Sequence, residues 1–261
     1  MEYIWYLFLG IAPALFFVCL IYHKDKFQPE PKAQIVKIFF LGILAIVPTA
    51  IIEWILQHKV FNIQMYEITT LLSVNIVACF IIIAPIEEFF KYSVVKKFVY
   101  NTEYFDEKID GVVYMIASAM GFAALENVMY IVNSVVPTWT GILRSISATP
   151  AHVIFSGFMG IYLGRARFET SACKSVVRIV QGLLVATVLH GTYNFLAYLN
   201  NFWTLLIIPF LLVFGVILIV KVNALAKESK ENQEIKEDQE IEEDQEADED
   251  QEADEKVKPI L

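Results

Sequence analysis

Seven apolar runs, each long enough to cross the hydrocarbon core of a bilayer, limit the possible folds of this chain more than any other feature. They cover about residues 3–22, 34–57, 70–95, 110–133, 144–164, 176–199 and 203–222. Roughly 20 apolar residues cross a membrane as a helix, which bonds all of its own backbone groups. The links between the runs are mostly short. The sequence therefore predicts an all-α, polytopic membrane helix bundle of about seven transmembrane helices.

Charge separates a membrane-embedded domain over residues 1–226 from an acidic tail over residues 227–261. Residues 228–261 carry 16 acidic and 4 basic side chains, so the tail accounts for the net charge of −9 of the whole chain. The tail repeats EDQE between Glu237 and Asp254. Such a sequence repels itself and cannot bury enough apolar surface to fold. We expect a disordered cytoplasmic tail.

Lysine and arginine indicate the orientation of the bundle. They cluster after the first, third, fifth and seventh runs, whereas the alternate loops carry only Lys59 and Arg144. Cytoplasmic loops of membrane proteins are enriched in these residues. We therefore expect a multi-pass protein with its N-terminus outside the cell and its C-terminus in the cytoplasm.

Six ionisable side chains lie inside four of the apolar runs. They are Glu87, Glu88, Lys91, Glu126, His152 and His190. A charge or imidazole at membrane depth is costly and by default marks a functional site. Because four different runs supply them, the sequence predicts one shared polar pocket. Glu53, near the end of the second run, is expected at the membrane interface instead.

The glutamate pair suggests acid–base chemistry. Glu87 and Lys91 are four residues apart and can pair on one helix face, whereas Glu88 is rotated by about 100° and need not share that partner. A carboxylate beside a water molecule can act as general base for hydrolysis, and a histidine with an amide can stabilise the developing oxyanion. We prefer Glu87 as the base, with Glu88 as the alternative. The structural alternative is an ion pair that only stabilises the third helix.

Other protease templates fit less well. Three glutamates and two histidines could hold zinc, but no HExxH motif occurs and the histidines lie on different runs, so no metal site is predicted and zinc stays an open alternative. An aspartyl protease needs two transmembrane aspartates, and the only aspartates before the tail are Asp25, Asp106 and Asp110, in or beside loops. No serine stands out beside Lys91.

The third run raises a problem of depth. Residues 70–100 would form a helix of about 46 Å, against a hydrocarbon core of roughly 30 Å. On the predicted orientation, Glu126 and both histidines lie in the outer half of the bilayer, while Glu87 lies closer to the cytoplasm. We expect a strongly tilted helix, or a break at Pro85 with a second helix starting near Ile86. Such a break would bring the groups into one pocket.

Four motifs occur in order, each on its own run. EEFFK (Glu87–Lys91) matches EExxK, FAALE (Phe122–Glu126) matches FxxxE, His152 follows, and HGTYN (His190–Asn194) matches HxxxN. This order, over about residues 80–200, resembles the PrsW family of bacterial intramembrane proteases. That family belongs to a superfamily with the CAAX prenyl proteases and the Abi membrane proteins, whose pattern is EExxxR, FxxxH and HxxxN. This chain departs from that pattern at two positions. Lys91 lies one position earlier than the expected Arg, and Glu126 stands where a His is expected. Both departures point toward PrsW.

The resemblance implies a peptidase of the bacterial cell membrane. Its expected partners are the lipid bilayer and a single-span membrane anti-sigma factor, which it would cut first on the extracytoplasmic side as part of a stress response; no nucleic acid is expected. The residues carried over are a water-activating glutamate (Glu87 or Glu88), the polar cluster of Glu126 and His152, the oxyanion-holding His190 and Asn194, and the supporting Lys91 and Phe122.

Two other functions stay open. Glutamate, lysine and histidine also build the proton relays of transporters, although no inverted repeat relates residues 1–130 to 131–222. The third possibility is a non-catalytic membrane scaffold with a structural polar core.

Overall fold

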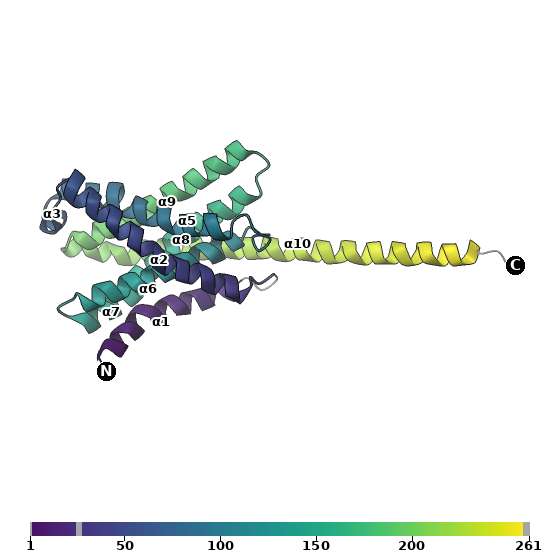
Figure 1. Cartoon of the computed structure of the whole chain (residues 1–261), viewed down its shortest axis with the longest axis horizontal. Helices are drawn as coiled ribbons and strands as arrows, with labels where there is room; N and C mark the ends of the chain where they lie inside the picture. Colours follow the sequence, from purple (N-terminus) through teal and green to yellow (C-terminus); the bar gives the residue numbers. More distant parts are fainter. Residues whose placement is uncertain (1, 25–27, 258–261) are drawn as a thin grey trace.

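The computed structural model describes residues 2–24 and 28–257, and every regular element in that part is helical (Figure 1). The elements are α1 (Glu2–Tyr22), α2 (Lys32–Ile55), η1 (Leu56–Val60), α3 (Met65–Thr70), α4 (Leu72–Val77), η2 (Ala78–Ile83), α5 (Ala84–Phe98), α6 (Asp110–Val132), α7 (Pro137–Ile146), α8 (Ala148–Arg167), α9 (Ala172–Tyr198), η3 (Phe202–Leu206) and α10 (Ile207–Val257). Together they form seven segments long and apolar enough to cross a membrane. The predicted polytopic bundle is confirmed.

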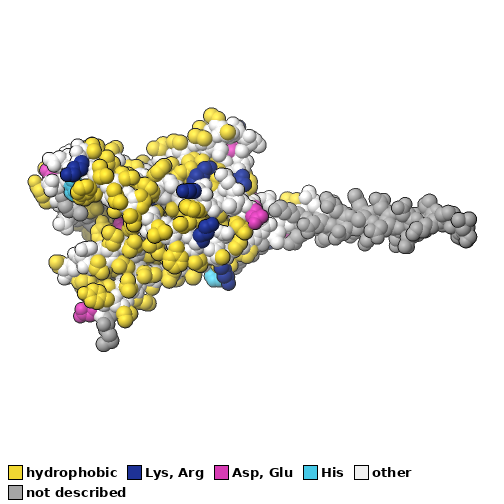
Figure 2. Space-filling model, viewed as in Figure 1, with side chains coloured by type: hydrophobic (Ala, Val, Ile, Leu, Met, Phe, Trp, Pro, Cys, Tyr) yellow, Lys and Arg dark blue, Asp and Glu magenta, His cyan; other side chains and the backbone are white. Residues whose placement is uncertain are grey.

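The outer surface of the bundle is suited to lipid. Large apolar side chains cover it in Figure 2. Leu44, Val47 and Ile51 of α2 are each more than half exposed, as are Leu184 and Val188 of α9. In water such a surface would drive association, but in a bilayer it contacts acyl chains. The polar groups of the spans are therefore free to face inward.

Helix α6 forms the centre of the bundle. Every residue from Asp110 to Ala124 is buried, because α1, α2, α5 and α8 all pack against this helix. Glycine permits the closest approaches, as small residues do in membrane helix pairs. A Cβ atom on Gly160 of α8 would lie 2.5 Å from the carbonyl oxygen of Gly111.

The crossing of α2 and α6 determines where the bundle opens. A Cβ on Gly42 would lie 2.1 Å from the Ser118 oxygen, and one on Gly121 would lie 1.9 Å from the Phe39 oxygen. The two backbones therefore touch at this point and diverge beyond it. Figure 1 shows α2 and α6 separating toward the left, and Figure 2 shows a notch in the outline there. One cavity described below lies between the diverging segments.

The third span is interrupted but not divided in two. It begins at Leu72, after an extended residue at Leu71, and runs through the π-helical segment η2 directly into α5. Pro85 occupies the first turn of α5 and offers no N–H to the turn before it, which is the turn that is π-helical. The predicted break with a new helix near Ile86 is therefore replaced by a π-helical stretch, a feature often found at functional sites.

The fifth span differs from the sequence-based expectation, and the last helix is longer than its apolar run. The fifth span, predicted over 144–164, begins with α7 and changes direction at Ser147, whose backbone is not helical (φ −121°, ψ −66°). The acidic segment continues α10 as a helix to Val257 in the described part of the chain, and the predicted disorder of the tail stays a prediction. Glutamate, glutamine, alanine and lysine favour a helix, and the pairs Lys227–Glu231 and Lys230–Glu234 support its exposed part at 3.3 and 3.1 Å.

Candidate active site

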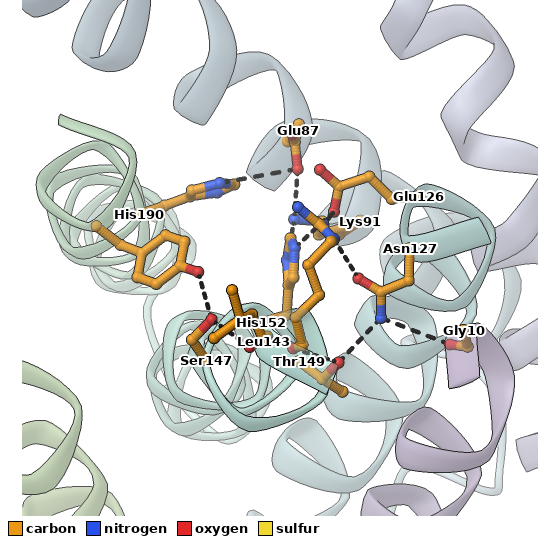
Figure 3. A network of polar contacts seen from close by, with 12 residues as sticks. Gly10, Glu87, Lys91, Glu126, Asn127, Leu143, Ser147, Thr149, His152 and His190 are labelled. Atoms are coloured by element: carbon orange, nitrogen blue, oxygen red, sulfur yellow. Dashed lines mark hydrogen bonds and ion pairs between the residues drawn. The ribbon is translucent and has the colours of Figure 1, made fainter. Parts of the chain in front are cut away.

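Lys91 lies at the centre of the polar cluster. Its Nζ donates to Glu87 Oε2 at 3.0 Å, to Glu88 Oε1 at 2.9 Å and to His152 Nδ1 at 2.9 Å (Figure 3). The predicted pairing of Glu87 with Lys91 is confirmed. The sequence left open whether Glu88 shares this partner, and at i,i+3 its carboxylate reaches the same ammonium group. All four side chains are buried, so one lysine compensates two glutamates in a site nearly without solvent.

Glu88 holds His190 in place. His190 Nδ1 donates to Glu88 Oε1 at 2.9 Å, and Ser156 Oγ donates to the other oxygen at 3.3 Å. The ring of Phe155 stacks on that of His190 with centroids 4.9 Å apart. Because both oxygens of the fully buried Glu88 are engaged, this carboxylate is suited to position the histidine.

His190 turns its second nitrogen toward Glu87. The distance from His190 Nε2 to Glu87 Oε2 is 3.9 Å, and Figure 3 shows the imidazole ring of His190, on α9, directed at that carboxylate. The conflict of depth inferred from the sequence is therefore resolved, since helices α5 and α9 meet at this level. The first and last motifs of the series share one site.

Glu126 and His152 form a second linked pair. An ammonium group only donates, so His152 accepts from Lys91 at Nδ1 and, when neutral, carries its proton on Nε2. That nitrogen donates to Glu126 Oε2 at 2.9 Å. Arg144 Nη2 lies 2.9 Å from the same oxygen, and Arg144 Nε donates to Asn127 Oδ1 at 2.7 Å. Glu126 thus has two donors on one oxygen.

Sequence reasoning missed the part played by Arg144. It was counted as a loop residue, because the segment before the fifth apolar run was read as a connection. The structure places it in α7, where a lone arginine among apolar residues would have been a usable signal. Its guanidinium also lies 3.9 Å from the ring centre of Tyr130.

Phe122 and Asn194, the other members of the motifs, lie in the same region. The ring centre of Phe122 is 4.5 Å from Lys91 Nζ, a cation–π contact that supports the ammonium group in an apolar setting. Asn194 lines a cavity of about 160 Å³ together with Glu87, His152 and His190. The structure thus brings every residue predicted from the motifs into one cluster or its adjoining cavity.

A larger cavity of about 570 Å³ adjoins the cluster between α2 and α6. Glu87, Glu126, Tyr130 and Tyr198 line both cavities, whereas Glu88 lines neither of them. Glu53 lines the larger cavity, so the site extends further along α2 than the sequence indicated. Of the two adjacent glutamates, Glu87 is therefore the one that faces these cavities.

The described residues also contain a group that could hold a metal ion. One ligand atom each from Glu87, Glu126 and His152 lies within 4.8 Å of the others. Two carboxylates and an imidazole are a donor set that divalent zinc accepts. The proton on His152 Nε2 would have to leave on binding, as is usual when a metal binds to protonated ligands. The donor set fits one divalent ion.

Comparison with known proteins identifies the family. Residues 30–222 match the model of the PrsW family intramembrane metalloprotease. The chain belongs to the PrsW family. It is 35% identical to Protease PrsW of Oceanobacillus iheyensis over 204 residues, which are 78% of this chain and 88% of that protein. For Protease PrsW of Bacillus subtilis the identity is 30%, over 77% of this chain and 87% of the relative. No solved structure matches the chain.

Membership decides between the alternatives left open by the sequence. PrsW family proteins are intramembrane proteases, so this chain is a hydrolase and a multi-pass membrane protein. The transporter and scaffold readings are not supported. The description of the family as metalloproteases also gives weight to the possible metal-binding group of Glu87, Glu126 and His152.

Proposed function

We propose that this chain is an intramembrane endopeptidase that makes the first cut, near the outer membrane surface, in a single-span anti-sigma factor, with Glu87 activating the attacking water. The observation that carries the mechanism is the division of labour between the two adjacent glutamates. Glu87 faces both cavities, whereas Glu88 is enclosed and bonded to Lys91, His190 and Ser156.

Glu87 would act first as a base and then as an acid. Its carboxylate takes a proton from a water molecule, and the water oxygen forms a bond to the carbonyl carbon of the scissile peptide. The carbonyl electrons move to oxygen, which becomes an oxyanion. When the C–N bond breaks, the proton held by Glu87 passes to the leaving nitrogen. The products are a carboxylic acid and an amine, and Glu87 returns to its starting state.

His190 and Asn194 would stabilise the oxyanion. His190 donates Nδ1–H to Glu88, and a proton on its Nε2 would point toward Glu87 and the cavity. The Asn194 side chain, which lines the same cavity, supplies an amide donor. Donors fixed before the reaction stabilise developing charge without reorganisation, which makes such a site effective in a water-poor setting.

A divalent ion, zinc being the ion best suited to the donors, would be held by Glu87, Glu126 and His152. Bound there, it would acidify a coordinated water and polarise a carbonyl oxygen. In both the metal-dependent and the metal-free version Glu87 lies next to the attacking water. Lys91 and Arg144 would hold the carboxylates in position through their ion pairs.

The substrate and the orientation rest on the family resemblance and on the charge pattern. Basic residues cluster in alternate connections, and this pattern supports an orientation with the divergent ends of α2 and α6 outside the cell. A cavity open toward that end suits a cut close to the outer surface.

Coexpression with single-span anti-sigma factors tests this function. Native protein should release a truncated substrate, and Glu87→Gln should not. A matched control is Glu2→Gln, since Glu2 is exposed at the start of α1, away from the cluster. Cleavage of the substrate by Glu87→Gln at the native rate would refute the proposed mechanism.

A further inference from the structure

We propose that Glu53 forms a subsite for a lysine or arginine side chain of the substrate, adjacent to the catalytic cluster. The inference rests on the proposed function in one respect, since it takes the larger cavity to be the place where the substrate binds. It assigns the cavity a preference that the cluster of catalytic residues alone does not explain.

One face of α2 lines the cavity. Its wall includes Ile46, Thr49, Ala50 and Glu53 of α2 and Gln57 of the following η1, positions that fall on one side of a helix. Opposite them, α6 contributes a similar series that begins with Phe122 and Glu126. Glu53 therefore belongs to a helix face of mixed polar and apolar side chains that lines the space between the helices.

Glu53 lies further toward the open end of the cavity than the catalytic residues do. It is 11 residues beyond Gly42, where α2 touches α6, whereas Glu126 is 5 residues beyond Gly121 on the opposite wall. At 1.5 Å per residue these separations are about 16 and about 8 Å along the helix axes. A group bound at Glu53 would sit between the cluster and the open end, about two to three extended substrate residues away from the reacting bond.

Glu53 also differs from the other carboxylates of the cavity in its partners. Glu87 is paired with Lys91, and Glu126 is paired with Arg144. Glu53 Oε1 is buried and accepts no hydrogen bond within the described part of the chain. The described residues that line this cavity include three glutamates and neither lysine, arginine nor histidine. Glu53 as a whole is half-buried, but a carboxylate oxygen that is buried without a donor is costly, so a cationic group entering the cavity would be bound favourably there.

The remainder of the wall favours a basic side chain over a bare ion. Ile46, Ala50 and Met129 offer apolar surface near the carboxylate. Lysine and arginine combine a long apolar stem with a charged head, and they occur near the ends of single membrane spans. The possible metal-binding group of the cluster does not include Glu53. The observations therefore point to a basic residue of the substrate near the cleaved bond.

Mapping of new N-termini in membranes of the native host tests the proposal. A strain lacking the chromosomal gene would express native protein, Glu53→Gln, Glu53→Asp, Glu2→Gln or Glu87→Gln, with protein amounts matched by immunoblot. We expect Glu53→Gln to reduce products with Lys or Arg within about five residues of the cut by about tenfold, the effect of losing one charged hydrogen bond. Glu53→Asp should restore part of this loss, and products from neutral sites should change less than about twofold.

Three results would overturn the subsite. They are native-like cleavage of basic sites by Glu53→Gln, an equal reduction of all products, and a native product set without basic residues near the cuts. Failure of the proposed function gives a different result, because the products would then persist in Glu87→Gln. The Glu2→Gln control should match the native protein throughout.

Discussion

Replacement of Lys91 by methionine should destabilise the fold more than any other single change in the cluster. Methionine has a similar length but no charge, so the substitution leaves Glu87 and Glu88 buried beside each other without their shared cation. Three donor contacts of 2.9 to 3.0 Å are lost together. Removing one partner of a buried ion pair typically costs about 3–5 kcal/mol, and we expect a loss in that range.

Equilibrium unfolding in mixed micelles, followed by circular dichroism during titration with a denaturing detergent, would measure this loss. Lys174→Met is the matched control, since Lys174 is exposed on α9 and should change the free energy of unfolding by less than about 0.5 kcal/mol. A double-mutant cycle with Glu88→Gln adds a sharper test. Removing one carboxylate along with the cation should recover at least about 1 kcal/mol. A Lys91→Met loss below about 1 kcal/mol, or additive effects in the cycle, would refute the reasoning.

Three further predictions concern the helix crossing, the second ion pair and the metal. Gly121→Ala should lower the free energy of unfolding by about 1–3 kcal/mol, because the new Cβ meets the Phe39 oxygen. The control Gly215→Ala should be tolerated, since the atom nearest to its new Cβ lies at 3.7 Å. Equal thermal stability of the two variants would contradict this prediction. Arg144→Gln should cost about 2 kcal/mol in the same unfolding assay by removing a charged donor from Glu126, and an unchanged midpoint would argue against that contact. Elemental analysis of purified protein should find one divalent ion per chain, and a strong chelator should remove it. The Glu126→Gln variant should lack the ion. Equal metal content in native and variant protein would exclude the proposed ligands.

The sequence was sufficient to predict the spans and the membership of the cluster. Long apolar runs leave the backbone few options in lipid, and charged residues within them have few places to go. For this reason Glu87, Glu126, His152 and His190 could be assigned to one pocket without coordinates. The motif order then indicated the family.

Features that depend on side-chain direction and local backbone geometry were not predictable in the same way. That Lys91 would bond both glutamates depends on rotamers, since positions i+3 and i+4 are both within reach. The π-helical stretch before Pro85 has no strong sequence signal. From the sequence, Arg144 was assigned to a loop and Glu53 to the membrane interface. Hydropathy gives the depth of a residue along an apolar run, but it does not show which face of the helix meets a cavity.

The rate of cleavage by Glu87→Gln, measured with a purified single-span anti-sigma factor in reconstituted bilayers, tests the central claim most directly. Glutamine keeps the shape of the side chain but cannot take a proton from water. The account predicts a loss of about 10²–10⁴-fold, with the fold retained as judged by the unfolding midpoint. A Glu87→Gln variant that cleaves at more than about a tenth of the native rate would contradict the assignment of Glu87 as the base.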